Sequence, residues 1–165
     1  MSPSFLPPPV SDSASLHLYT DASKQAFGGT FSSHWIRGIW PASWQQLSIT
    51  VLEIFPILAL VATFSDVFAN THITFHCDNQ AVVAIINKQS SKCKITMSIL
   101  RPLILLLLQN NISFHSVHIP GVENIVADSI SRLQETQTLL RRSGMQQSPT
   151  KVPDHFMPQN FPLSF

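Results

Sequence analysis

The stretch HITFHCDNQAVVAIINK, residues 72–88, indicates the fold class most directly. Its first six residues are rich in β-branched and aromatic side chains, which predicts a short strand over 72–77 that ends at Asp78. The segment 80–88 then predicts a helix. A strand that leads directly into a helix is typical of a sheet covered by helices.

The elements on either side of this unit extend the same pattern. Upstream, alternating apolar residues predict three strands and a long apolar run predicts one buried helix, over 16–20, 26–31, 35–40 and 49–68. Downstream, we expect a helix, a strand and a last helix, over 95–109, 112–119 and 124–132. The order βββαβααβα predicts an α/β fold with a mixed sheet. Because Pro56 is tolerated only in a first helical turn, we expect its helix to begin near 51–53.

Proline and polar residues mark both ends of the chain. Residues 1–15 are rich in Pro and Ser and predict an arm or linker outside the core. Residues 16–133 form the predicted domain. Residues 134–165 are rich in Pro, Gln and Ser and predict a C-terminal tail or spacer, with a short helix near 133–142 followed by extended chain.

The composition excludes several classes of protein. Hydrophobic residues make up 44% of the 165 residues and charged residues 12%, which excludes a chain disordered throughout. The net charge of +1 gives no strong overall field toward nucleic acid, so any such contact depends on a local patch. The most hydrophobic run, 103–108, is far shorter than the roughly 20 residues of a membrane span, so we expect no membrane partner.

The cysteines and histidines do not predict a disulfide framework or a zinc site. Cys77 and Cys93 are too few for disulfide staples and fit a reducing compartment. Four histidines lack metal-ligand spacing with these cysteines: His17, His72, His76 and His115. Because no secretory signal is visible, we expect an intracellular protein, in the nucleus or the cytoplasm.

Acidic residues gather at the ends of the predicted elements. Four of the six acids within 16–133 directly follow apolar residues: Asp21, Glu53, Asp78 and Asp128. The carboxyl edge of a sheet, where Asp21 and Asp78 are predicted, is where open α/β sheets bind ligands. Converging carboxylates repel one another, and a pair of Mg²⁺ ions would relieve the repulsion and clamp a phosphodiester.

Each acid also has a plainer interpretation. Asp21 is able to form an Asx turn, Asp78 to cap the following helix, Asp128 to face solvent, and Glu53 to favour a helix N-terminus. Aspartate occupies the ends of both predicted strands. This placement favours one shared site over a separate structural role for each of the four acids.

Four segments of the domain resemble the RNase H domain of retroelement polyproteins: TDAS at 20–23, LE at 52–53, CDNQA at 77–81 and HIPGVENIVADSISR at 118–132. The last segment is the most specific and looks like the gypsy-type and DIRS-type versions. The run LEIFPILAL at 52–60 looks more like the DIRS-type, whose elements carry a tyrosine recombinase. The resemblance covers 16–133, and the tail resembles the spacer before such a recombinase.

The resemblance implies an RNase H-like fold, with a five-stranded mixed sheet and helices on both faces. It also implies an endonuclease that cuts the RNA strand of an RNA–DNA hybrid with two Mg²⁺ ions, for which Mn²⁺ is able to substitute. Asp21, Glu53, Asp78 and Asp128 match the metal-binding acids of the family. A reverse transcriptase or a tyrosine recombinase of the same element is the implied protein partner.

Other positions carry weaker expectations. By the same resemblance, His118 assists proton transfer or product release, and Ser23, Asn79 and Gln80 contact the hybrid. Lys88 and Lys92 belong, with Lys94, to the basic cluster of the domain, which is either a solvated turn or a phosphate-contacting patch.

Two other functions remain open from the sequence. The domain is either the ribonuclease described above, a catalytically silent scaffold or binding module of a polyprotein, or a nuclease of the same superfamily that acts on DNA. The intact set of four acids favours an enzyme over a silent module.

Overall fold

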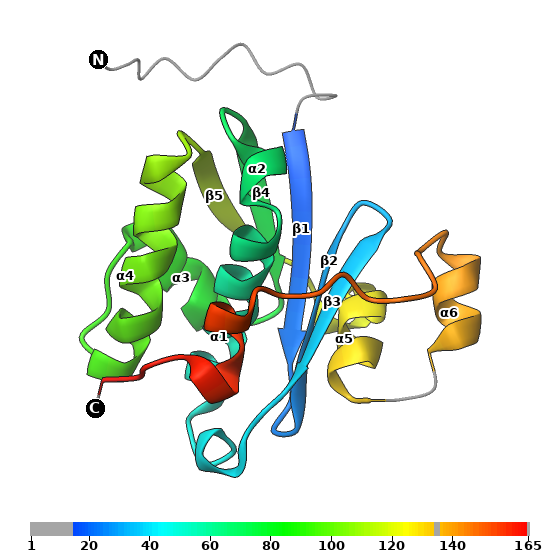
Figure 1. Ribbon diagram of the computed structural model, residues 1–165, viewed down its shortest axis with the longest axis horizontal. Helices are drawn as coiled ribbons and strands as arrows, with labels where there is room; N and C mark the ends of the chain where they lie inside the picture. The colour runs from blue at the N-terminus through cyan, green and yellow to red at the C-terminus, as the bar shows by residue number, and fades with distance from the viewer. Residues whose placement is uncertain (1–14, 134–135, 165) are drawn as a thin grey trace.

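A five-stranded mixed sheet forms the centre of the molecule (Figure 1), in a computed structural model that describes residues 15–133 and 136–164. The predicted arm, residues 1–15, lies outside these ranges except for Ser15. The strands are β1 (Ser15–Ala22), β2 (Ala26–Phe31), β3 (His34–Ile39), β4 (His72–Cys77) and β5 (Ser113–His118). Their order across the sheet is β3-β2-β1-β4-β5.

The strand directions bring two predicted site residues to one edge. The hairpin strands β2 and β3 run antiparallel to their neighbours, whereas β4 is parallel to β1 and β5 is parallel to β4. Tyr19 of β1 lies beside His76 of β4. Two residues further along each strand, Asp21 and Asp78 therefore emerge at the same carboxyl edge.

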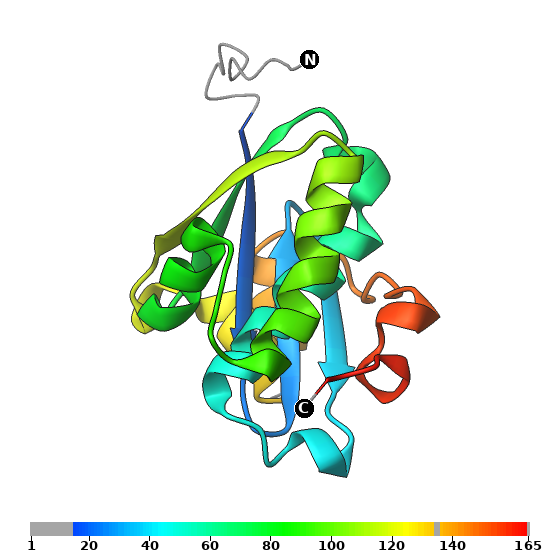
Figure 2. The ribbon, with the colours of Figure 1, turned by 90° about the vertical axis from the view of Figure 1, so that its left-hand side faces the viewer.

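Helices cover both faces of the sheet, as Figure 2 shows with α4 in front of it and α5 behind. On one face lie α1 (Ile49–Thr63), α3 (Gln80–Lys88) and α4 (Lys94–Gln109). On the other face, α5 (Ile125–Ser131) packs against β1 and β2. The remaining short helices are η2 (Ala42–Trp44), α2 (Ser65–Phe68), η3 (Gly121–Glu123), α6 (Gln137–Arg142), η4 (Asp154–Phe156) and η5 (Pro158–Asn160). The predicted α/β class, with a five-stranded mixed sheet and helices on both faces, is confirmed.

Helix α1 starts earlier than predicted and keeps Pro56 in its interior. The Ser48 hydroxyl caps it by accepting the Val51 N–H at 3.3 Å, so the expected start near 51–53 was wrong. A proline inside a helix costs about 3 kcal/mol, but every side chain from Val51 to Val61 is buried. Because each buried Leu, Ile or Phe contributes about 1.5–3 kcal/mol, core packing outweighs the proline. The helix ends at Thr63, so its predicted extension to Phe68 was also wrong.

Helix α5 lies unusually close to the sheet because β2 presents a glycine to it. A Cβ at Gly28 would lie 2.7 Å from the Cβ of Ile130 and 2.9 Å from the Ala127 carbonyl oxygen. Ile130 also packs with Trp35 and Leu140 in a small apolar cluster on this face. Asp128 lies between Ala127 and Ile130 in α5, so the close approach carries it toward Asp21 at the end of β1.

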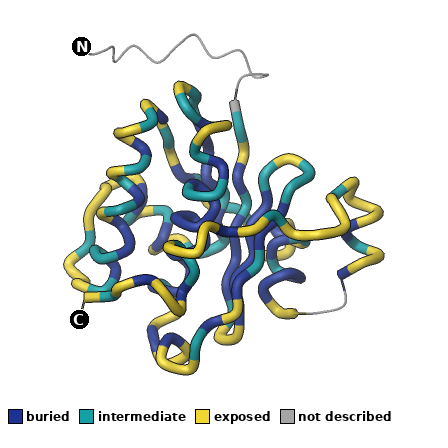
Figure 3. Tube along the Cα trace, in the orientation of Figure 1, coloured by how far each residue is buried: buried dark blue, intermediate teal, exposed yellow. Residues whose placement is uncertain are grey.

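Residues 136–164, which the sequence analysis places in a tail, run back across the sheet domain from α6 toward α4 (Figure 1). The Thr150 N–H donates to the Trp35 carbonyl at 2.7 Å, and the Trp35 indole donates to the Gln146 carbonyl at 2.8 Å. Val152 and Phe161 are buried within the main core, while most of this segment stays exposed (Figure 3). Within the described part of the chain, no helix has both the length and the apolar character needed to cross a membrane.

Candidate active site

Asp21 occupies the end of the central strand. It is the seventh residue of β1 and is only 4% exposed. The Ser131 hydroxyl of α5 donates to its Oδ2 at 3.1 Å. The carboxylate is therefore held from the α5 face of the sheet.

Glu53 reaches the same place from the opposite face. It is 3% exposed in α1, and its Oε1 accepts the Ala22 N–H of β1 at 2.7 Å. The Cys77 thiol at the end of β4 donates to Oε2 at 3.6 Å. These two contacts fix Glu53 across the ends of β1 and β4, so it is not a solvated first-turn acid.

Asp78 and Asp128 complete the group from a loop and from α5. Asp78 follows β4, and a Cβ at Gly121 would lie 3.3 Å from its Oδ2. The cap of α3 is Asn79 rather than Asp78, because the Val82 N–H donates to Asn79 Oδ1 at 3.2 Å. Asp128 accepts the Arg132 Nε–H at 2.8 Å, and its side chain also interacts with Asp21.

Burial and mutual repulsion shift the protonation of the two innermost acids. Burial, then the negative charge of Asp78, raises the pKa of Asp21 to about 7. Burial, followed by the charges of Asp21 and Asp78, raises the pKa of Glu53 to about 10. In the described ranges, none of Asp21, Glu53 and Asp78 forms a salt bridge. No side-chain cation of the described residues therefore offsets the repulsion among these three acids, and in the absence of metal ions bound protons relieve it instead.

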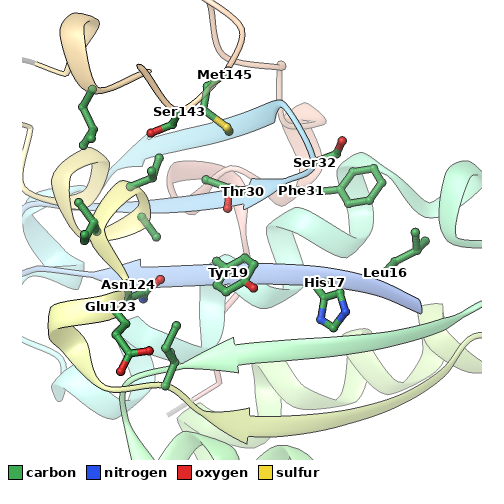
Figure 4. A pocket seen from close by; sticks show the side chains of 15 residues that line it. Leu16, His17, Tyr19, Thr30, Phe31, Ser32, Glu123, Asn124, Ser143 and Met145 are labelled. Atoms are coloured by element: carbon green, nitrogen blue, oxygen red, sulfur yellow. The ribbon is translucent and has the colours of Figure 1, made fainter. Parts of the chain in front are cut away.

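An open cleft of about 440 Å³ exposes Asp21, Glu53 and Asp78 at the carboxyl edge, whereas Asp128 is not part of its lining, although its partner Arg132 is. Its lining consists of Asp21, Ala22, Ser23, Lys24, Ile49, Glu53, Asp78, Asn79 and Arg132. Lys24 does not neutralise the carboxylates, because its Nζ donates to the Leu47 carbonyl at 2.6 Å. A larger hollow of about 780 Å³ lies elsewhere, between the α5 side of the sheet and α6 (Figure 4), and its lining contains none of the four acids.

The fold of the chain is similar to that of solved structures. An RNase H1 from the halophilic archaeon Halobacterium salinarum superposes with a TM-score of 0.59 at 16% identity, covering 70% of this chain and 93% of the other. The chain has the ribonuclease H fold. The LC11-RNase H1 crystallised with an RNA/DNA hybrid gives a TM-score of 0.57 at 16% identity, covering 75% of this chain and 99% of the other. An N-terminal RNase H domain from Mycobacterium tuberculosis gives 0.53 at 13% identity, covering 73% and 98%.

These likenesses concern the fold alone, since the sequences have diverged far. No family model matches this chain, and no curated protein matches it in sequence. The interpretation of the four acids as one site therefore depends on their geometry in this structure and not on sequence similarity.

The other predicted site residues are not all brought to the cleft. Ser23 and Asn79 line it, but the Ser23 hydroxyl is already engaged, donating to the Ser131 carbonyl at 2.6 Å. Gln80 is exposed at the start of α3. His118 is exposed at the end of β5 and is not part of the lining.

The lysines lie further from the acids than Asn79 does. Lys88 ends α3, and Lys92 is exposed in the turn before α4; neither lines the cleft. In Figure 1 this turn descends to the end of the molecule where β1 points, which is the carboxyl edge. The structure thus places the basic turn at the same end of the molecule as the acids.

Three residues that contact the acids were missed from the sequence. Cys77 was interpreted as a core thiol, and it is fully buried but also donates to Glu53. Ser131 and Arg132 follow Asp128 by three and four residues, so they lie on the same side of α5. That helical spacing is the signal that would have indicated them.

Proposed function

We propose that this chain is a metal-dependent endoribonuclease that cleaves the RNA strand of RNA–DNA hybrids. The observation that carries the proposal is the convergence of Asp21, Glu53, Asp78 and Asp128 at the carboxyl edge of a ribonuclease H fold. Two acids come from strand ends, and one comes from a helix on each face. Carboxylates gathered in this way repel one another and cost the fold stability, and no structural role of the four acids offsets that cost.

The chemistry of the site fits hard divalent cations. Its donors are carboxylate oxygens, the ligands that Mg²⁺ prefers, and Mn²⁺ is able to replace Mg²⁺ in such a set. Glu53, Cys77 and Asp78 each place a ligand atom within 4.8 Å of the others. Burial and the neighbouring Glu53 raise the pKa of the Cys77 thiol, and the thiol donates to Glu53. Mg²⁺ prefers oxygen ligands, so the carboxylates and not this sulfur are the proposed ligands.

The chain's own residues prepare the site for two such ions. Asp21, Glu53, Asp78 and Asp128 would hold them. Bound divalent ions activate water and stabilise the departing 3′-oxygen in phosphodiester hydrolysis. Ser131 and the Ala22 N–H orient Asp21 and Glu53 before any ion binds. Such preorganisation removes the cost of arranging the ligands during the reaction.

The proposed substrate is an RNA–DNA hybrid. One protein of the same fold has been crystallised with such a hybrid, which supports the choice. Recognition would use the 2′-hydroxyls and the groove shape rather than base identity, so binding should depend on salt and little on sequence. We assign contacts with the hybrid backbone to Asn79, Gln80, Lys88 and Lys92, a weaker one to Ser23, and assistance in proton transfer or product release to His118.

We further propose that the domain derives from a retroelement. The motifs quoted above, above all residues 118–132, support this origin. A reverse transcriptase or a tyrosine recombinase encoded by the same element would then be the protein partner. Such a partner would supply the substrate affinity that a small basic turn gives only weakly.

Cleavage of an end-labelled RNA–DNA hybrid tests the activity. We expect cutting of the RNA strand with Mg²⁺, none with EDTA, and a loss of at least about 100-fold in Asp78→Asn. Asp66→Asn is the matched control, because Asp66 is an exposed acid in α2 and should cut normally. Hybrid binding without cutting would support a silent module, and metal-dependent cutting of duplex DNA alone would support a DNA nuclease; either result would overturn the proposal.

A further inference from the structure

Histidines from three strands gather on one face of the sheet. In the pairing of β1 with β4, His17 lies beside Thr74, and Tyr19 beside His76. In the pairing of β4 with β5, His115 also lies beside Thr74. Because side chains alternate between faces along a strand, residues 17, 72, 76 and 115 all project to the same side.

The ring nitrogens of these histidines converge in two pairs. His17 Nδ1 lies 2.8 Å from His76 Nε2, and His72 Nε2 lies 2.7 Å from His115 Nδ1. The rings of His72 and His115 also stack, with centroids 4.9 Å apart, whereas those of His17 and His76 are tilted by 38° at 5.1 Å. Separations of 59 and 43 residues along the chain explain why linear spacing did not indicate the two pairs.

Neighbouring side chains fix two of the rings. The Ser113 hydroxyl lies 2.8 Å from His72 Nδ1, which leaves Nε2 as the nitrogen directed at His115. Tyr19 stacks on His76 with centroids 4.4 Å apart and planes 12° from parallel. Partners that set the ring orientation in this way are the usual support of metal-binding histidines.

The cluster is open to solvent. His17 and His115 are exposed, and His72 and His76 are partly buried. Figure 4 shows His17 and Tyr19 projecting from β1 on the side of the large hollow, of which both form part of the lining. Burial and the nearby His115 lower the pKa of His72.

We propose that each histidine pair binds one divalent transition-metal ion, such as Ni²⁺ or Cu²⁺, with water completing the coordination. Each pair is joined in this structure by a hydrogen bond between ring nitrogens, which the ion would replace. Imidazole nitrogens suit these ions, whose affinity for nitrogen ligands is the highest among the common divalent metals. This inference is independent of the proposed nuclease function.

Calorimetric titration with Ni²⁺ tests the proposal. The protein is used without a tag, in a Cys93→Ser background that removes the exposed thiol, and with excess Mg²⁺ to occupy the acidic cleft. We expect two ions per chain. His17→Gln should weaken the binding of one ion at least about tenfold, His115→Gln that of the other, and the double variant both.

His34→Gln and His155→Gln are the matched controls, because these residues lie outside the cluster on β3 and in η4. They should leave Ni²⁺ binding unchanged. Unchanged binding in the His17/His115 double variant, or an equal loss in the two controls, would overturn the proposal.

Paramagnetic broadening by Ni²⁺ in the unaltered chain gives a readout that needs no cluster variant. The broadened amide signals should come from β1, β4 and β5. Broadening centred on any other part of the molecule would overturn the proposal even if the variants failed to fold.

Discussion

Each face of the sheet contributes one helical acid to the candidate active site, and the two acids differ greatly in the amount of core packing behind them. Glu53 comes from α1, whose side chains from Val51 to Val61 are buried in the main core. Asp128 comes from the seven-residue α5, whose apolar cluster contains three buried residues among those that the structure describes, Trp35, Ile130 and Leu140. The difference teaches that the position of Glu53 follows from folding itself. The position of Asp128 depends on a few close contacts of α5. Substitutions at those contacts should therefore lower activity more than they lower stability.

Truncation in the core should have the largest effect on stability. Phe55→Ala removes a fully buried ring that packs with Trp40, Trp44 and Phe161. We expect a loss of about 3–5 kcal/mol in the free energy of unfolding, measured by urea denaturation. Ile130→Ala on the thin face should cost less, near 2 kcal/mol. Equal costs for the two variants would contradict the asymmetry between the faces.

Two adjacent glycines of β2 offer a sharper comparison, because they face opposite sides of the sheet. Gly28→Ala places a methyl group 2.7 Å from Ile130, which should displace α5 and lower hybrid cleavage about 100-fold, with a stability loss of about 1–3 kcal/mol. At Gly29 the nearest atoms would be 3.3 Å away, in Ile36, so Gly29→Ala should change cleavage less than threefold. Cleavage rates and thermal melts of both variants measure this, and an equal loss of cleavage would contradict it.

The pH dependence of stability should report the crowded carboxylates in protein stripped of divalent ions. The pKa of Asp21 is raised in the folded state to about 7, so the folded chain binds more protons than the unfolded one between about pH 4 and 7. The free energy of unfolding should therefore fall as the pH rises through this window, by on the order of a few kcal/mol. Asp21→Asn should flatten this slope in thermal melts from pH 5 to 8. A slope unchanged by the substitution would contradict the assignment.

The smallest effect is expected at the exposed ion pair of α5. Arg132→Gln removes the 2.8 Å contact with Asp128, whose side chain is 37% exposed. Since exposed pairs contribute little, the free energy of unfolding obtained from thermal melts should change by less than about 1 kcal/mol. Cleavage should nevertheless fall severalfold, because Asp128 loses the partner that orients it. A normal rate at saturating Mg²⁺ would exclude this orienting role.

The sequence predicted the strand and helix around Asp78 to the residue, because 72–77 and 80–88 combine a clear pattern with polar boundaries. It missed the start of α1, because the usual cost of Pro56 is overridden by burial that only the tertiary structure supplies. It also missed the packing of Val152 and Phe161, which lie in a segment without periodicity.

The candidate site was predictable only in part. Asp21 and Asp78 at strand ends indicated a common edge, because parallel strands bring their carboxyl ends together. The Cys77 thiol on Glu53 and the histidine pairs were not predictable, since both depend on contacts between neighbouring elements that no local spacing reveals. His118 illustrates the reverse case, for its motif position suggested a role, yet its exposed side chain does not line the cleft.

The central claim is that the acids at the carboxyl edge bind divalent ions together. Electron paramagnetic resonance with Mn²⁺ measures this directly, as loss of the free-ion signal on titration with protein at pH 7.5. We predict two bound ions per chain, displaced by excess Mg²⁺, with affinity at least about tenfold weaker in Asp78→Asn and unchanged in Asp66→Asn. Full Mn²⁺ binding by the Asp78→Asn variant, or no binding by the unaltered chain, would contradict the account.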